Sequence, residues 1–303
     1  MDRSINKLVN LYAFEDYLNA QVRSLPELPE VEQVSPRVFR LLGGNPGHMQ
    51  LQGTNTYLVG TGNRRILIDT GQGIPLWINH IEELLSKHDI TISQVLLTHW
   101  HGDHTGGVPD LLRLHPELKE SIYKCDPDTG QKPIMDRQIF RVEGATIHAL
   151  FTPGHSTDHM CFFLEEENAL FTGDNILGHG TTAVEDLSLY MTSLCKMQHR
   201  CCEIGYPGHG QVIWDLRRVL QAEIGRKHRR ERQVIAGLKA LQLKSKEGAA
   251  PRELVSHLFG ALPEEVVDHV FEPFMKEVLM KLAVEKRVGF RFKSGHRVWF
   301  AKG

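Results

Sequence analysis

The pattern His-x-His-x-Asp-His at residues 99–104 restricts the possible folds more than any other feature of the sequence. It directly follows a short apolar run, so it lies where a buried strand would end. His99 and His101 are two residues apart, and in an extended segment their side chains point to the same side. Asp103 and His104 follow where a helix would begin. Imidazole nitrogens together with a carboxylate oxygen suit zinc and similar dications, so the pattern predicts a metal site at a strand end.

Three later segments have the same construction, a short apolar run that ends in glycine and a potential ligand. Glycine beside a ligand lets the backbone turn sharply and approach an ion closely. The ligands that these segments supply are His155, Asp174 and His209. With the four candidates of residues 99–104 they make a set of seven, which divides naturally between two metals. We expect His99, His101 and His155 at one metal, Asp103, His104 and His209 at the second, and Asp174 as the bridge between them.

The pattern of apolar residues predicts an α/β layered fold followed by a helical region. Between residues 37 and 210, strand-length apolar runs alternate with turn residues, and helical periodicity falls at residues 75–88 and 108–116. After residue 210 the strands stop, and a long charged helix is predicted at about residues 214–243. Two further helices and a terminal hairpin follow, which is the element order of a winged-helix-like module.

Three parts of the chain are expected on these grounds. Residues 1–30 form an N-terminal helical extension, because apolar residues recur there at helical spacing before a proline-containing connector. Residues 31–215 form the catalytic domain. Residues 216–303 form the long basic helix and the small C-terminal helical, winged-helix-like module.

Composition limits the class of protein. The chain has 303 residues, of which 41% are hydrophobic and 24% charged, as in soluble globular proteins. No apolar run reaches the length of about 18 residues that a membrane span needs, and the N-terminus lacks an apolar signal sequence. We therefore expect a cytoplasmic protein that does not bind membranes. The five cysteines are odd in number and lack C-x-x-C spacing, so we expect buried thiols rather than disulfides or zinc ligands.

The small net charge of -2 conceals two unlike parts of the chain. Residues 1–215 contain 16 Lys and Arg against 27 Asp and Glu, whereas residues 216–303 contain 19 against 10. The basic run at residues 226–232 is either a docking face for an acidic partner or the solvated side of a helix. Charge alone does not choose between an acidic carrier protein and RNA as the partner.

These motifs resemble those of the metallo-β-lactamase superfamily, an αββα sandwich with a dinuclear site on one edge of its two sheets. The resemblance implies the same division of the seven ligands, and it gives Asp69 a supporting role that orients ligating imidazoles. The sequence departs from the commonest metal-dependent β-lactamases, which place a cysteine at the position of Asp174 and lack a counterpart of one second-metal histidine. The resemblance therefore points to hydrolases of thioesters and phosphodiesters.

Longer stretches are similar to two groups within the superfamily, at residues 45–62, 96–113, 151–181 and 205–210. One is the animal endoribonuclease β-lactamase-like protein 2. The other is the fungal group of stand-alone metallo-β-lactamase-type thioesterases, and this similarity includes residues 3–14 and so covers nearly the whole chain. It implies hydrolysis of an aromatic polyketide thioester on the acyl carrier protein domain of a non-reducing polyketide synthase, with release of the polyketide acid.

Two other functions stay open at this point. One is a metal-dependent endoribonuclease that cleaves single-stranded RNA. The other is an adaptor without catalysis that binds carrier protein or RNA through the basic tail, although a filled set of seven ligands argues against a dead site.

The chemistry implied by the resemblance needs no covalent enzyme intermediate. Two zinc ions suit the ligands best, although manganese or iron is also compatible, and water activated by the ions is the expected nucleophile. Asp103 is the candidate that orients this water and accepts its proton. No G-x-S-x-G nucleophile motif is present. We favour structural roles over substrate contact for His159 and His179, and strand packing for Asn55 and Tyr57; the loop before them is a candidate wall of the substrate mouth.

Overall fold

The structure is a computed structural model that describes residues 24–245, 247–293 and 295–302. The helix predicted at residues 1–23 lies outside these ranges. The chain divides into two compact units, with the boundary between Leu220 and Gln221, inside helix α6 (Leu216–Lys244). None of the helices in the described ranges is long and apolar enough to span a bilayer.

Two β-sheets form the centre of the first unit. The first sheet has its seven strands in sequence order, namely β1 (Val31–Ser35), β2 (Val38–Leu42), β3 (Asn55–Val59), β4 (Arg64–Ile68), β5 (Thr91–Leu96), β6 (Ile122–Lys124) and β7 (Lys132–Pro133). The second sheet has five strands, in the order β12 (Ile204–Pro207), β11 (Ala169–Gly173), β10 (Met160–Leu164), β9 (Ala145–Phe151) and β8 (Ile139–Val142). Strands β4 and β5 are parallel, and so are β11 and β12.

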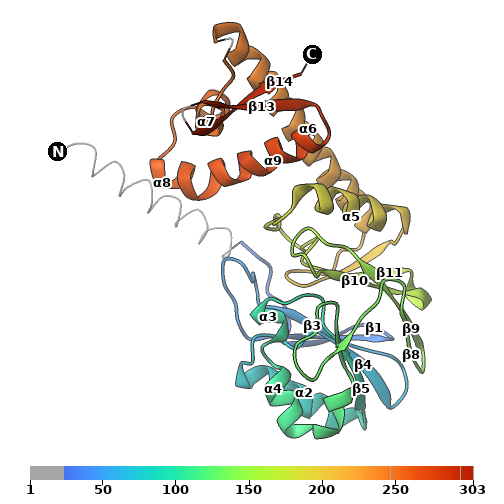
Figure 1. Cartoon of the computed structure of the whole chain (residues 1–303). Coiled ribbons are helices and arrows are strands. Elements are labelled where there is room, and N and C mark those ends of the chain that lie inside the picture. Colours follow the sequence, from blue (N-terminus) through green and yellow to red (C-terminus); the bar gives the residue numbers. More distant parts are fainter. Residues whose placement is uncertain (1–23, 246, 294, 303) are drawn as a thin grey trace, which may run out of the picture. The chain divides into compact units, whose positions relative to one another are not determined.

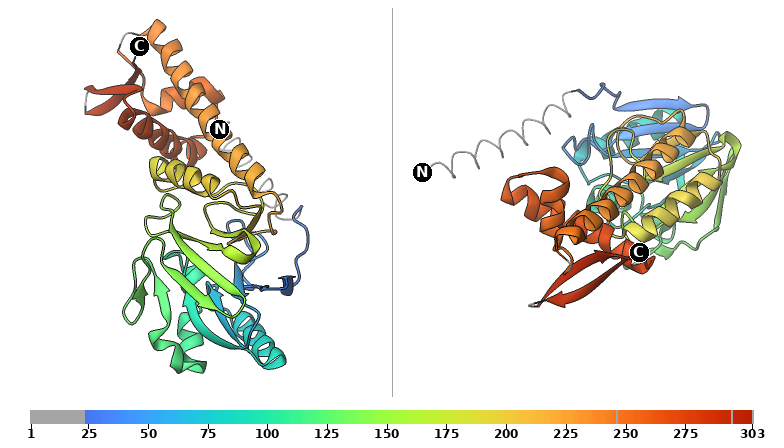
Figure 2. Two further views of the ribbon diagram at one scale, coloured as in Figure 1. Left: turned by 90° about the vertical axis from the view of Figure 1, so that its right-hand side faces the viewer. Right: turned by 90° about the horizontal axis from the view of Figure 1, so that it is seen from above.

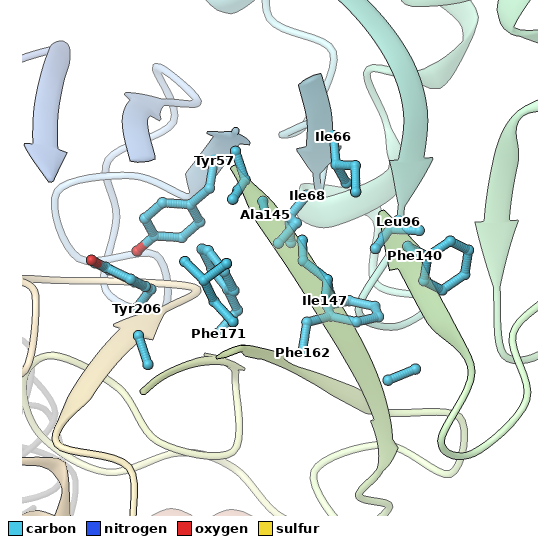
Figure 3. Packing of buried hydrophobic residues seen from close by; sticks show 14 of the residues in the cluster. Tyr57, Ile66, Ile68, Leu96, Phe140, Ala145, Ile147, Phe162, Phe171 and Tyr206 are labelled. Atoms are coloured by element: carbon cyan, nitrogen blue, oxygen red, sulfur yellow. The ribbon is translucent and has the colours of Figure 1, made fainter. Parts of the chain in front are cut away.

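The main core lies between the two sheets (Figure 3). Side chains alternate along each strand, so Tyr57 faces this core while its neighbour Leu58 belongs to a second cluster on the outer face of the first sheet. The aromatic rings of Tyr57, Phe171 and Tyr206 join the two sheets, with ring centres 4.9–5.6 Å apart. Strands buried on both faces explain why the strand sequences are runs of apolar residues rather than strict alternations.

Helices cover the outer faces of the sheets. Helix α2 (Pro75–His88) buries Trp77, Ile78 and Ile81 in the outer cluster of the first sheet, and α4 (Val108–Leu114) lies on the same side. Helix α5 (Leu187–His199) covers the second sheet, so the order of layers is helix, sheet, sheet, helix (Figures 1 and 2). The predicted αββα sandwich is confirmed.

Some elements and one residue class differ from the sequence prediction. The prediction missed α5, which begins after the N-cap Asp186. It also missed the strands β6, β7 and β8, which have too few residues for a periodic signal, and β1, which has no fully buried residue. All five cysteines are free, as expected, but the prediction that they are buried is wrong for Cys195 and Cys201. Cys195 lies on α5 outside its buried set of residues, and Cys201 follows the end of that helix.

The second unit is helical with a terminal hairpin. Helix α6 begins at Leu216 and ends at Lys244, close to the bounds predicted from its charge pattern. The helices α7 (Pro251–Phe259), α8 (Glu264–Val266) and α9 (Glu272–Val284) follow, with a π-helical turn at Val267–Phe271. Strands β13 (Val288–Lys293) and β14 (His296–Ala301) pair antiparallel. The core of this unit contains Leu254, Met275 and Trp299.

Candidate metal centre

The strands β4, β5, β9, β11 and β12 deliver the candidate residues to one edge of the sandwich. Strands that carry ligands run in the same direction within each sheet, so their carboxyl ends meet there. Asp69 follows β4, His99 and His101 follow β5, and His155, Asp174 and His209 follow β9, β11 and β12 in turn. Asp103 and His104 lie in the short helix α3 (Gly102–Thr105).

The seven predicted ligands come together in the two predicted groups. His99, His101, His155 and Asp174 form one group, and Asp103, His104 and His209 form the other; within each group the potential ligand atoms lie within 4.8 Å of one another. Glycine permits this approach at Gly208, where a Cβ atom would lie 2.2 Å from Asp174 Oδ1. The glycines seen beside the ligands in the sequence therefore have a steric reason.

Asp174 lies between the two groups. Its Oδ2 is 3.6 Å from His155 Nε2 in the first group and 3.2 Å from His209 Nε2 in the second, and its Oδ1 is 3.4 Å from His104 Nε2. The carboxylate is buried, yet Oδ1 has no hydrogen-bond partner among the described residues. A buried carboxylate oxygen without a partner is costly, and a cation held between the groups would satisfy it.

Hydrogen bonds on the outer ring nitrogens fix the protonation of the imidazoles. His155 Nδ1 donates to the Ala183 carbonyl at 2.8 Å, and His104 Nδ1 donates to Asp69 Oδ2 at 2.8 Å. His99 Nδ1 lies 2.9 Å from Thr98 Oγ1, whose proton is given to Asp69. When the rings are neutral, the Nε2 atoms of these three histidines are then acceptors that point into the cluster. His101 Nδ1 lies 2.8 Å from His99 Nε2 and 3.1 Å from His155 Nε2. These short distances fit a cation that the lone pairs of the nitrogens share.

Asp69 supports ligands from both groups without joining either. Its Oδ1 accepts the Thr98 amide proton at 2.8 Å, and its Oδ2 accepts from the Thr98 hydroxyl at 2.9 Å and from His104 Nδ1. The residue has φ +59°, a left-handed conformation that aspartate adopts more readily than most residues. This geometry matches the supporting role that the sequence resemblance implies for Asp69.

Burial and charge divide the histidines into two kinds. Burial lowers the pKa of His99 well below its ordinary value, and it also lowers the pKa of His101. Burial acts in the same sense on His104, but the charges of Asp174 and Asp69 outweigh it and raise its pKa well above the ordinary value. Burial raises the pKa of Asp103, but the hydrogen bond from His209 outweighs it and lowers the pKa to about 2. Without metal, His104 in the second group is therefore protonated near neutral pH, whereas Asp103 is ionised.

These protons make the stability of the metal-free protein depend on pH. At His209, burial lowers the pKa, but the charge of Asp174 outweighs it and raises the pKa from 6.5 to about 9. Protonated His209 therefore stabilises the fold. This stabilisation is fully present below about pH 6.5 and is lost as the pH rises through about 9. We expect chelator-treated protein to lose up to about 3 kcal/mol over this interval, measured as a fall in the urea midpoint. His209→Gln should reduce the fall, and an undiminished fall in that variant would contradict the assignment.

His159 is fully buried beside the cluster and contacts a backbone group of the bridging residue. Its Nε2 accepts the backbone N–H of Asp174 at 3.1 Å, and its ring lies 5.2 Å from that of His99 and 5.9 Å from that of His155. Gly173 has φ +47°, and a Cβ there would lie 2.5 Å from His159 Nε2. The preferred structural interpretation of this histidine matches its contacts.

Removal of the His159 ring should weaken metal binding. We expect His159→Ala to lower the metal affinity about 10- to 100-fold, as the loss of groups that orient ligands does elsewhere, and His159→Gln to retain part of it because the amide oxygen can accept the Asp174 proton. Competition with a chromophoric chelator measures the affinity. His148→Ala is the matched control, since His148 lies on β9 of the second sheet and pairs with Glu165. Equal metal affinity in all three variants would contradict this role.

Asn55 and Tyr57 hold the loop that carries His209. Asn55 Nδ2 donates to the carbonyls of Pro207 and Gly210, both at 2.9 Å, and the Tyr57 hydroxyl donates to Pro207 at 2.7 Å. Both residues are buried in the first sheet, whereas the loop belongs to the second. Sequence reasoning assigned them to strand packing; it missed their part in placing a ligand, because no local pattern reveals a contact about 150 residues away.

A pocket of about 630 Å³ opens onto the cluster. Its wall includes ligand candidates from both groups, with His101, Asp103 and Asp174 among them. The rest comes from two loops, one at residues 48–51 and the other at residues 177–183. The first is the loop that the sequence indicated as a substrate wall. The second includes His179, which is exposed and lines the pocket.

Known proteins are similar to this chain in sequence over nearly its whole length. Residues 49–124 match the metallo-beta-lactamase superfamily. The atrochrysone carboxyl ACP thioesterase of Aspergillus fumigatus is 59% identical over 300 residues, which are 96% of this chain and 95% of the relative. The lactamase-like protein ptaB of Pestalotiopsis fici is 54% identical over 99% of this chain and 96% of its own, and an atrochrysone carboxyl ACP thioesterase of Aspergillus chevalieri is 52% identical over 100% and 99%. The chain therefore belongs to the metallo-β-lactamase superfamily, in the family that includes these relatives.

Solved structures agree on the fold. A β-lactamase domain protein from Burkholderia ambifaria has a TM-score of 0.69 at 16% identity and covers 92% of this chain and 97% of its own. A metallo-beta-lactamase from Pontibacter korlensis has a TM-score of 0.55 at 20% identity, and it covers 65% of this chain and 97% of its own. Family and cluster together indicate a divalent metal at this site.

Proposed function

We propose that this protein is a thioesterase that hydrolyses an aromatic polyketide thioester on an acyl carrier protein and releases the polyketide carboxylic acid. The observation that carries the proposal is the 59% identity, over 96% of this chain, to a relative named for that activity. A second relative with the same name is 52% identical over the whole chain. The pocket supports it, because 630 Å³ lies within the usual range for sites of small organic ligands. We further propose that the carrier protein belongs to a non-reducing polyketide synthase.

The site is proposed to hold two zinc ions. His99, His101 and His155 would bind the first, Asp103, His104 and His209 the second, and Asp174 both. When bound, such ions lower the pKa of water toward neutrality and polarise the scissile carbonyl. The inward Nε2 lone pairs and the unpartnered Asp174 Oδ1 support this assignment.

Asp103 is the proposed proton acceptor for the attacking water. It lines the pocket, and its pKa of about 2 keeps it unprotonated at neutral pH. Its Oδ2 is 3.3 Å from His209 Nε2, so these two proposed ligands of the second metal lie side by side. The thiolate of the carrier's pantetheine arm is a good leaving group, so water activation and stabilisation of the oxyanion are the demanding steps.

A cysteine or serine nucleophile is not part of the proposal. None of the described residues that line the pocket is a cysteine or a serine. Burial raises the pKa of the Cys161 thiol to about 12 and that of Cys202 to about 11, so neither forms a thiolate near neutral pH. Water is therefore the proposed nucleophile, without a covalent enzyme intermediate.

The test is to incubate the purified protein with a carrier protein that has been loaded with an aromatic polyketide. We expect stoichiometric discharge with the wild type and none above background with His101→Ala or Asp103→Ala. Full discharge by either variant would overturn the proposal. Cleavage of single-stranded RNA at enzyme concentrations that leave the thioester intact would instead support the endoribonuclease.

A further inference from the structure

The C-terminal hairpin of the second unit carries several basic residues and no acidic one. Residues 287–302 contain Arg287, Arg291, Lys293, Arg297 and Lys302 but no Asp or Glu. One face of this hairpin also exposes aromatic rings, and neither feature has a part in the hydrolytic site. We call Phe290, Phe292 and Arg297 the aromatic–arginine face.

The strand register places these side chains together. Phe290 lies opposite Trp299, and Phe292 lies opposite Arg297, and residues directly opposite one another share a face. Trp299 is buried in the core of the unit, whereas Phe290 is 39% exposed and Phe292 is 67% exposed. The two phenylalanine rings are therefore accessible to a partner, whereas Trp299 is not.

Arg297 is held in position by the rings. Its guanidinium carbon lies 4.9 Å from the centre of the Phe290 ring and 5.9 Å from that of Phe292, and Nη1 lies 3.4 Å from Met280 Sδ. No acidic partner of Arg297 occurs in the part of the chain that the structure describes. An arginine that is pre-ordered by stacking, with N–H donors left over, is suited to binding carboxylates.

The basic run on α6 is a weaker candidate. Arg226 and Lys227 pair with the buried Glu223, and His228 pairs with Glu231. The Arg230 guanidinium lies over Phe259 and Phe274 inside the unit. Most of this run therefore stabilises its own helix and module.

We propose that the aromatic–arginine face docks the acidic carrier protein that delivers the thioester; this rests on the proposed function. Exposed aromatic rings beside an ordered arginine are typical of the centres of protein interfaces, and an acidic partner complements the excess of cations on the hairpin. Single-stranded RNA fits less well, because Arg297 already covers ring surface on which bases would stack.

The test uses Phe292→Ala and Arg297→Glu in the full chain, with Arg232→Glu as the matched control, since Arg232 is an exposed cation on α6 in the same unit. Each protein is assayed with two thioesters of the same aromatic acyl group, one on holo carrier protein and the other on N-acetylcysteamine. We expect the first two variants to raise the KM for the carrier-bound substrate at least about tenfold, with turnover of the small thioester and the melting temperature unchanged. The control should behave as wild type.

Equal losses on both substrates, or an equal effect of Arg232→Glu, would overturn the docking face. Direct binding of holo carrier protein, measured by calorimetry, separates this proposal from the proposed function. If wild type hydrolyses neither thioester but binds the carrier, and Arg297→Glu abolishes that binding, the function fails and the docking face stands. If the variants instead lose binding of a single-stranded RNA, and the carrier protein does not bind, the face serves RNA and the proposal is wrong.

Discussion

Asp174→Ala is expected to reduce hydrolysis at least about a hundredfold and to lower the metal content of the purified protein. The physical reason is its position, because one carboxylate lies within 3.6 Å of imidazoles from both groups. Without it, each group loses the negative charge that it shares with the other. Metal analysis and kcat/KM with a small thioester measure the two effects.

Asp110→Ala is the control for this substitution. Asp110 is a carboxylate of α4 whose partner is the exposed Arg113, so its loss should change neither metal content nor rate. An Asp174→Ala protein with normal metal content and a normal rate would remove the basis for a bridging role.

Removal of the metal by a chelator is expected to abolish hydrolysis and to lower the melting temperature by roughly 10 °C. A ligand present at about a thousandfold above its Kd stabilises a fold by about 4 kcal/mol, and each kcal/mol shifts the melting temperature of a domain of this size by about 2–4 °C. The cause is local, since His101 Nδ1 lies 2.8 Å from His99 Nε2 and 3.1 Å from His155 Nε2, and these nitrogens need a cation or a proton between them.

Addition of zinc to the stripped protein should restore both properties, and manganese and iron can be compared in the same assay. A stripped protein with an unchanged rate and melting temperature would show that the cluster holds no functional metal.

The cluster of candidate metal ligands was predictable because each candidate is marked locally. All seven lie next to a short apolar run or a glycine turn, and parallel strands bring such positions to one edge. Helix α5 was missed although its signals are present: Asp186 caps the first turn by accepting from the Leu189 amide, and Tyr190, Leu194 and Met197 recur at helical spacing on its buried face. Long-range contacts, such as those that Asn55 makes to the His209 loop, leave no trace in a local pattern.

The structure shows which of the described basic residues of the C-terminal part have partners and which do not. Arg226 and Lys227 of α6 pair with Glu223, and the Arg230 guanidinium lies over Phe259, whereas Arg297 of the hairpin has no acidic partner among the described residues. Net charge indicated that a tail suited an anionic partner, but only the pairing of individual residues distinguishes the hairpin from the helix.

The most direct test of the central claim is mass analysis of the acid released from a loaded carrier protein by metal-stripped enzyme, as zinc is added back. We expect that no acid is released without metal, that release increases with added zinc and reaches its maximum at two equivalents, and that Asp174→Ala shows no such increase. Release of the acid at the full rate by the stripped enzyme would contradict the central claim.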